Sequence, residues 1–96
     1  MMPIHLTFNN IRHSDAVSSH VNEAFEELIK ITDNKFPFHV NLNKIAPESY
    51  HVGINCSYKN KNLFSKADHE NLYKALSKGI DSMKIQVIRK SEKVRN

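Results

Sequence analysis

The six histidines are the residues of this chain best suited to binding a metal ion. They are His5, His13, His20, His39, His51 and His69. A structural or catalytic zinc site needs three or four ligands at compatible spacing, and no His-x-x-x-His pair, Cys-x-x-Cys pair or adjoining acidic cluster is present. His39 and His51 can face each other across two predicted strands, but two ligands do not complete a site. The sequence therefore predicts neither a metal site nor a cofactor.

Residues that carry other kinds of chemistry are also few. The only glycines, Gly53 and Gly79, cannot form a glycine-rich phosphate loop. The single cysteine, Cys56, lies at an inward position of an alternating segment and is expected to be a small core side chain. The carboxylates are better explained as helix ends or solvent-exposed groups than as paired acid and base, namely Asp15, Asp68 and Asp81. We therefore expect no enzymatic activity and no small-molecule substrate.

The distribution of charge is more informative than these candidates. The chain has 14 lysines and arginines against 10 acidic residues, and its net charge of +4 corresponds to a pI near 9.3. Residues 1–48 hold four cations and six anions, a net charge of −2, whereas residues 49–96 hold ten cations and four anions, a net charge of +6. Such asymmetry indicates a polyanion-binding surface, with nucleic acid the first candidate and an anionic membrane the second.

The C-terminal helix concentrates the cations on one side. Its apolar residues recur at spacings of three and four: Leu72, Tyr73, Leu76, Ile80, Met83, Val87 and Val94. At about 100° per residue the opposite side carries Lys74, Lys78, Arg89 and Lys93, while Lys84 and Arg95 flank one edge and Lys90 the other. A merely solvated helix usually mixes charges of both signs, so the scarcity of anions favours polyanion binding over solubility alone. The predicted RNA-binding residues are Lys74, Lys78, Lys84, Arg89, Lys90 and Lys93.

Some residues near this row keep two interpretations. Ile85 and Ile88 interrupt the polar side of the helix. They can contact sugar or protein in a complex, or they can be scattered surface residues, which are common. Lys59, Lys61 and Lys66 lie near a predicted hairpin, and the sequence does not decide whether they contact RNA.

Hydrophobic periodicity predicts the elements that position these residues. Strands are expected over 4–9, 38–43, 50–58 and 63–67, joined by turns at 46–49 and 59–62. One amphipathic helix is expected over 15–31, with Ser14 as its N-cap, and a second follows Asp68, which is the expected cap of that helix. The order β-α-β-β-β-α predicts an α+β domain, a four-stranded sheet with both helices packed on one face. The other face would be polar and free of anions, showing His5, Thr7, Asn9, His39, Asn41, Asn43, His51, Asn55 and Ser57.

The length of 96 residues suits one domain. No window approaches 18 uncharged apolar residues, and the N-terminus lacks the features of a signal peptide. Together with the lone cysteine, these features predict a cytoplasmic protein that does not enter a membrane.

Two segments, residues 6–21 and 67–83, resemble the ribosome hibernation-promoting factors, the family that includes protein Y and is also known as the sigma-54 modulation proteins. In the first segment the matching residues are Asn9, Asn10, Ile11, Ser14, Ala16, Val17 and Val21. In the second they are Ala67, Leu72, Tyr73, Ala75, Leu76, Ile80, Asp81 and Met83. The chain differs from the family pattern at four positions, Asn71, Ser77, Ser82 and Ile85, which leaves open a paralogue with another partner.

The resemblance implies a fold similar to double-stranded-RNA-binding domains and a function on the ribosome. The basic helix would bind rRNA of the small ribosomal subunit and occlude the messenger and transfer RNA sites during stress or in stationary phase. Residues 1–96 would form a single ribosome-binding domain without a C-terminal dimerisation domain, monomeric off the ribosome and acting with a separate ribosome modulation factor. The alternative is a general RNA-binding or protein-interaction module that uses the polar sheet face.

Overall fold

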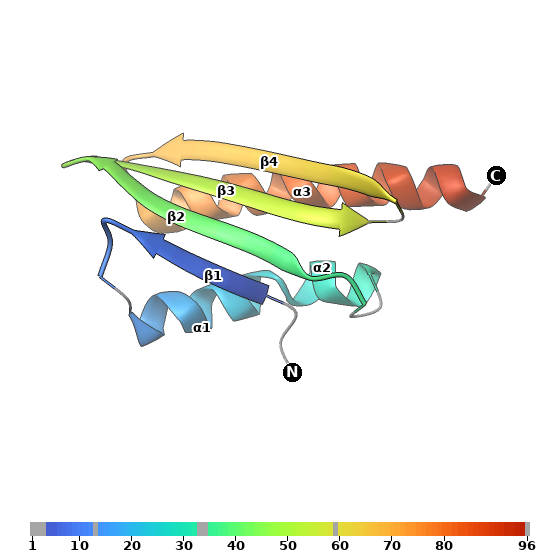
Figure 1. Ribbon diagram of the computed structural model, residues 1–96, viewed down its shortest axis with the longest axis horizontal. Helices are drawn as coiled ribbons and strands as arrows, with labels where there is room; N and C mark the ends of the chain where they lie inside the picture. The colour runs from blue at the N-terminus through green and yellow to red at the C-terminus, as the bar shows by residue number, and fades with distance from the viewer. Residues whose placement is uncertain (1–3, 13, 33–34, 59, 96) are drawn as a thin grey trace.

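Four strands and three helices form two layers (Figure 1). The computed structural model describes residues 4–12, 14–32, 35–58 and 60–95, with side chains as far as Arg89. In chain order the elements are β1 Ile4–Asn9, α1 Asp15–Ala24, α2 Glu26–Ile31, β2 Phe38–Ala46, β3 Ser49–Tyr58, β4 Lys61–His69 and α3 Leu72–Arg95. The helices cover one face of the sheet, so the predicted α+β architecture is confirmed.

The sheet has the strand order β1-β2-β3-β4. β1 and β2 are parallel, with Ile4 opposite Phe38. The helices between them form a crossover connection that returns the chain to the end of the sheet at which β1 began. The other two pairs are antiparallel hairpins, as expected for the predicted meander. Strands β2 and β4 are longer than predicted, since pairing with β3 continues to Ala46 and His69. The second hairpin turns at Asn60, whose φ of 66° is left-handed.

The first predicted helix divides at Phe25 into α1 and α2. Ser14 caps α1 as expected, and its hydroxyl accepts a hydrogen bond from the Val17 N–H at 3.4 Å. At Phe25 the backbone changes to ψ −4°, which interrupts regular helical geometry. Phe25 is fully buried, with its ring 5.3 Å from that of Phe38 between centroids. The break therefore lies at a residue anchored in the core.

The core lies between the sheet and the helices. It consists of the apolar side chains that periodicity placed inward on β2, β3, α1, α2 and α3, including Val21, Leu28, Val40, Ile54 and Met83, each fully buried. Among the described residues, no helix is long and apolar enough to cross a membrane.

Gly79 allows α3 to approach the sheet closely. A Cβ atom at this position would lie 3.3 Å from Cδ1 of Ile54 and 3.6 Å from Cγ1 of Val52. The Gly79 carbonyl also accepts a hydrogen bond of 2.8 Å from the hydroxyl of buried Ser65 on β4. Glycine destabilises a helix by about 1 kcal/mol relative to alanine. At position 79 the missing side chain permits close packing of α3 against the sheet.

The predicted cap of α3 is wrong. Asp68 lies within β4 and hydrogen-bonds to Nδ1 of His51 on the neighbouring strand. The cap is Asn71, whose side-chain oxygen accepts hydrogen bonds from the N–H groups of Tyr73 at 2.9 Å and Lys74 at 3.2 Å. The strand extends past Asp68, so α3 begins three residues later than the sequence pattern suggested.

We expect Asn71→Ala to lower the free energy of unfolding by about 1 kcal/mol, because two N–H groups of the first turn lose their acceptor. Asn71→Asp is the matched control, since a carboxylate keeps the acceptor and favours the positive end of the helix dipole. Urea denaturation of both variants measures the difference. Equal losses in the two variants would contradict the assignment of Asn71 as the cap.

Candidate nucleic-acid interface

Helix α3 buries one side against β3 and β4 and exposes the other. Leu76, Ile80, Met83 and Val87 are buried as predicted, and Ala75 joins them. The prediction for Tyr73 is wrong, because it is 40% exposed and packs edge-on against His20 of α1 with centroids 4.7 Å apart. Val94 lies in α3, but its side chain is outside the described part.

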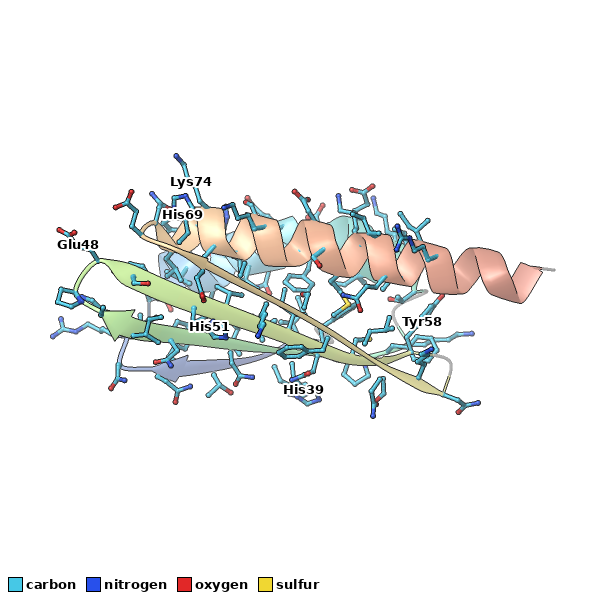
Figure 2. The ribbon with its side chains drawn as sticks, turned by 90° about the horizontal axis from the view of Figure 1, so that it is seen from above. His39, Glu48, His51, Tyr58, His69 and Lys74 are labelled. Carbon is cyan, nitrogen blue, oxygen red and sulfur yellow. The ribbon has the colours of Figure 1, made fainter. Side chains whose placement is uncertain are left out.

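The exposed side of α3 carries three of the predicted cations whose side chains the structure describes. Lys74, Lys78 and Arg89 are all exposed, and Figure 2 shows Lys74 directed away from the sheet. Within the side chains that the structure describes, none of these three has a carboxylate within 4.0 Å. Lys90 and Lys93 lie on the same helix, and their side chains are outside the described part. We call Lys74, Lys78, Arg89, Lys90 and Lys93 the α3 cation row.

Lys84 differs from the rest of the predicted set. Its ammonium group donates a hydrogen bond of 2.7 Å to Glu27 of α2, and the two groups form an ion pair. The contact with Lys84 lowers the pKa of Glu27, and the same hydrogen bond raises the pKa of Lys84. Lys84 was predicted as a further RNA-binding cation, but in this structure its charge already has a partner.

The helix layer is divided into an acidic half and a basic half. Exposed carboxylates predominate on α1 and α2, where they are Asp15, Glu23, Glu26 and Glu27. On α3 the described acidic residue is Asp81, which is exposed three residues from both Lys78 and Lys84 but has no cation within 4.0 Å among the described residues. Ile85 and Ile88 are 50% and 40% exposed between these charges, as the sequence indicated.

One of the described hairpin cations, Lys66, lies on a different surface from this row. Lys66 is exposed on β4 opposite Gly53, so it points to the open face of the sheet, away from α3. Lys61 is exposed at the start of β4 in the second hairpin, and Lys59 lies outside the described residues. A flat RNA surface that contacts the α3 cation row therefore cannot also contact Lys66.

The open face of the sheet largely matches the sequence prediction. The nine predicted polar residues share this face in the observed register, but β4 adds Asp68, so the face is not free of anions. His39 lies opposite Asn55 rather than His51, and its ring stacks on that of His5. The described residues include no group of three or more histidine, cysteine or acidic side chains that could hold a metal ion.

The sequence reading missed Phe64, a large exposed side chain on this face. It is 50% exposed on β4, between the inward-facing residues Leu63 and Ser65. Side chains of a strand alternate between its two faces, so the inward positions of Leu63 and Ser65 predict that Phe64 points outward. This alternation is the signal that identifies Phe64 from the sequence.

Cys56 is a buried core thiol, as predicted, with 2% of its surface exposed. Burial raises its pKa to about 11.

We expect the native protein not to react with a thiol reagent at pH 8, and to react once per chain in strong denaturant. Because the unfolded thiol ionises first, stability should fall as pH rises from about 9 to about 11, by up to roughly 1.4 kcal/mol per pH unit. A Cys56→Ala variant should lack this component of the pH dependence, which denaturation at several pH values measures.

Comparison with known proteins identifies the family. The family model described as "Sigma 54 modulation protein / S30EA ribosomal protein" matches residues 4–95. No curated protein sequence gives a significant match.

Two solved structures have the same fold. The N-terminal domain of Thermus thermophilus Protein Y has a TM-score of 0.80 and 21% sequence identity, covering 90% of this chain and 96% of that one. A ribosomal subunit interface protein from Coxiella burnetii also has a TM-score of 0.80, with 14% identity, covering 93% of this chain and 97% of that one. The family is one of ribosome-binding factors without enzymatic activity. The chain therefore belongs to the sigma 54 modulation protein / S30EA ribosomal protein family, the family of the ribosome hibernation-promoting factors.

Proposed function

We propose that this protein is a translation inhibitor that binds rRNA of the small ribosomal subunit through the α3 cation row. The observation that carries the proposal is the exposure of Lys74, Lys78 and Arg89 on one side of a helix, without carboxylate partners among the described residues. Lysine and arginine in this arrangement contact backbone phosphates and release counterions, which supplies affinity without sequence readout. Lys90 and Lys93 extend the proposed contact along the helix.

The proposed mechanism is steric. A domain with principal extents of 47 × 25 × 18 Å, bound where messenger and transfer RNA would lie, excludes those ligands without making or breaking a covalent bond. The proposed setting is the cytoplasm of stressed or stationary-phase cells. There the protein would be monomeric off the ribosome and would act with a separate ribosome modulation factor.

Co-sedimentation with purified small subunits at different salt concentrations tests the proposal. About five phosphate contacts imply that affinity falls by roughly two to three orders of magnitude between 50 and 200 mM salt. In vitro translation should be inhibited over the same concentration range in which the protein binds. Binding that does not respond to salt would contradict the electrostatic mechanism, and binding without inhibition would contradict occlusion.

A further inference from the structure

Phe64 forms an exposed aromatic surface on the open face of the sheet, opposite the helix layer. Its ring lies over Gly53, because two ring carbons are 3.7 and 3.9 Å from where a Cβ of residue 53 would stand. Gly53 is buried although it belongs to this face. Glycine within a strand often marks close approach by another group, and here it leaves space for the ring to lie against the sheet. Phe64 is therefore supported from below and remains 50% exposed above.

A second ring surface lies two strands away. His5 and His39 stack with centroids 5.0 Å apart and ring planes inclined by 15°. Asn55 of β3 is opposite His39 on one side and opposite Phe64 on the other. The two ring surfaces are thus separated by two strand spacings, about 10 Å, with an amide between them.

A hollow of about 230 Å³ adjoins His39 and Asn55. It is bordered further along the strands by Ser57 and Asn62, whose hydroxyl and amide oxygen are joined by a hydrogen bond of 2.8 Å. Pockets that enclose drug-sized ligands typically measure about 300–1,000 Å³, so this hollow suits a single ring system rather than a whole nucleotide.

The charges on this face favour an anionic ligand with polar edges. Lys66 is exposed opposite Gly53, and Asp68, the carboxylate among the described residues of this face, is already hydrogen-bonded to His51. Asparagine amides supply donors and acceptors for base edges, while the exposed rings offer faces for stacking. Exposed aromatic rings, amides and a free cation on one sheet are the combination that binds unpaired nucleobases.

We propose that the open sheet face binds unpaired nucleobases of RNA, one stacked on Phe64 and another against the His5–His39 pair. The proposal rests on the proposed function in that the ligand is RNA, but it concerns a separate surface. Figure 2 shows Lys74 of α3 and His39 of β2 on opposite sides of the molecule. The α3 cation row contacts phosphates on one side, and the sheet holds single-stranded bases on the other.

The test measures binding of fluorescently labelled octaadenylate to the full chain at 50 mM salt. Phe64→Leu removes the ring on which one base stacks, so it should weaken octaadenylate binding about 5- to 150-fold. Phe64→Tyr keeps the ring and should bind octaadenylate with near-normal affinity. The control is Ile45→Ala, which removes a side chain that is 54% exposed at the end of β2. This control should bind octaadenylate normally. Ring-proton NMR shifts on titration should be largest at Phe64, His5 and His39.

The outcomes separate this proposal from the proposed function. The double variant Lys78→Glu with Arg89→Glu should lose small-subunit binding. In this background, Phe64→Leu should still weaken octaadenylate binding by the same factor as in the unaltered chain. If the unaltered protein binds subunits but not octaadenylate, or if Phe64→Leu binds octaadenylate as tightly as the unaltered chain, the sheet proposal is overturned and the proposed function stands. Protection of the open face in a dimer of this chain, measured by sedimentation equilibrium and NMR, would also overturn it. Circular dichroism confirms that each variant is folded.

Discussion

Reversing two charges in the α3 cation row should abolish most small-subunit binding. Lys78→Glu combined with Arg89→Glu replaces two cations of the proposed phosphate contact by carboxylates at exposed positions. A hydrogen bond to a charged group contributes about 1.5–3 kcal/mol, so losing two predicts a decrease in affinity of about 100-fold or more. The slope of log affinity against log salt should also become shallower by about two. Filter binding or co-sedimentation with purified subunits measures both quantities.

The matched control is Lys30→Glu combined with Lys35→Glu. This pair changes the net charge of +4 by the same amount, but the altered residues are exposed on α2 and just after it, beside the acidic half of the helix layer. Control binding within about threefold of the unaltered protein would assign the effect to the surface of α3. If both double variants lost binding equally, net charge alone would account for the affinity.

Phe38→Ala should have the largest effect on stability. Phe38 is fully buried at the start of β2, between Ile4 of β1 and Cys56 of β3, and its ring packs against Phe25 of the helix layer. Truncating such a residue removes the transfer free energy of the ring and leaves a cavity, at a cost of about 3–5 kcal/mol. A domain of this size typically has about 5–14 kcal/mol in total, so a large part of its stability would be lost.

Urea denaturation followed by circular dichroism measures this loss. Phe64→Ala is the control of equal chemistry, because the same ring is removed from a half-exposed position that leaves no closed cavity. A change at Phe38 no larger than the change at Phe64 would contradict the placement of the Phe25–Phe38 contact at the centre of the core.

Periodicity predicted most of the fold because each element buries one side. Alternation along β1, β2 and β3 and the three-and-four spacing along α3 reflect the contact of these elements with one core. The errors occurred where local signals competed with tertiary contacts. Asp68 has the chemistry of a helix cap, but strand pairing with β3 continues through it to His69. The sequence has no glycine or proline at the break between α1 and α2, which lies at the fully buried Phe25.

The candidate site was predicted less completely than the fold. Helical geometry alone placed Lys74, Lys78 and Arg89 on the exposed side of α3. The partner of Lys84 could not be predicted, because Glu27 is 57 residues distant in the chain and meets it only when α2 and α3 pack together. The surface formed by Phe64, Gly53 and the stacked histidines likewise depends on strand register, which a single sequence does not specify.

The division of the helix layer into acidic α1–α2 and basic α3 also bears on how the protein approaches its target. Before contact, a polyanion would attract one half and repel the other, so the incoming molecule experiences a torque that turns α3 forward. Misoriented encounters are then corrected during diffusion. This guidance is expressed in the association rate constant, which should fall with added salt as the field of the protein is screened.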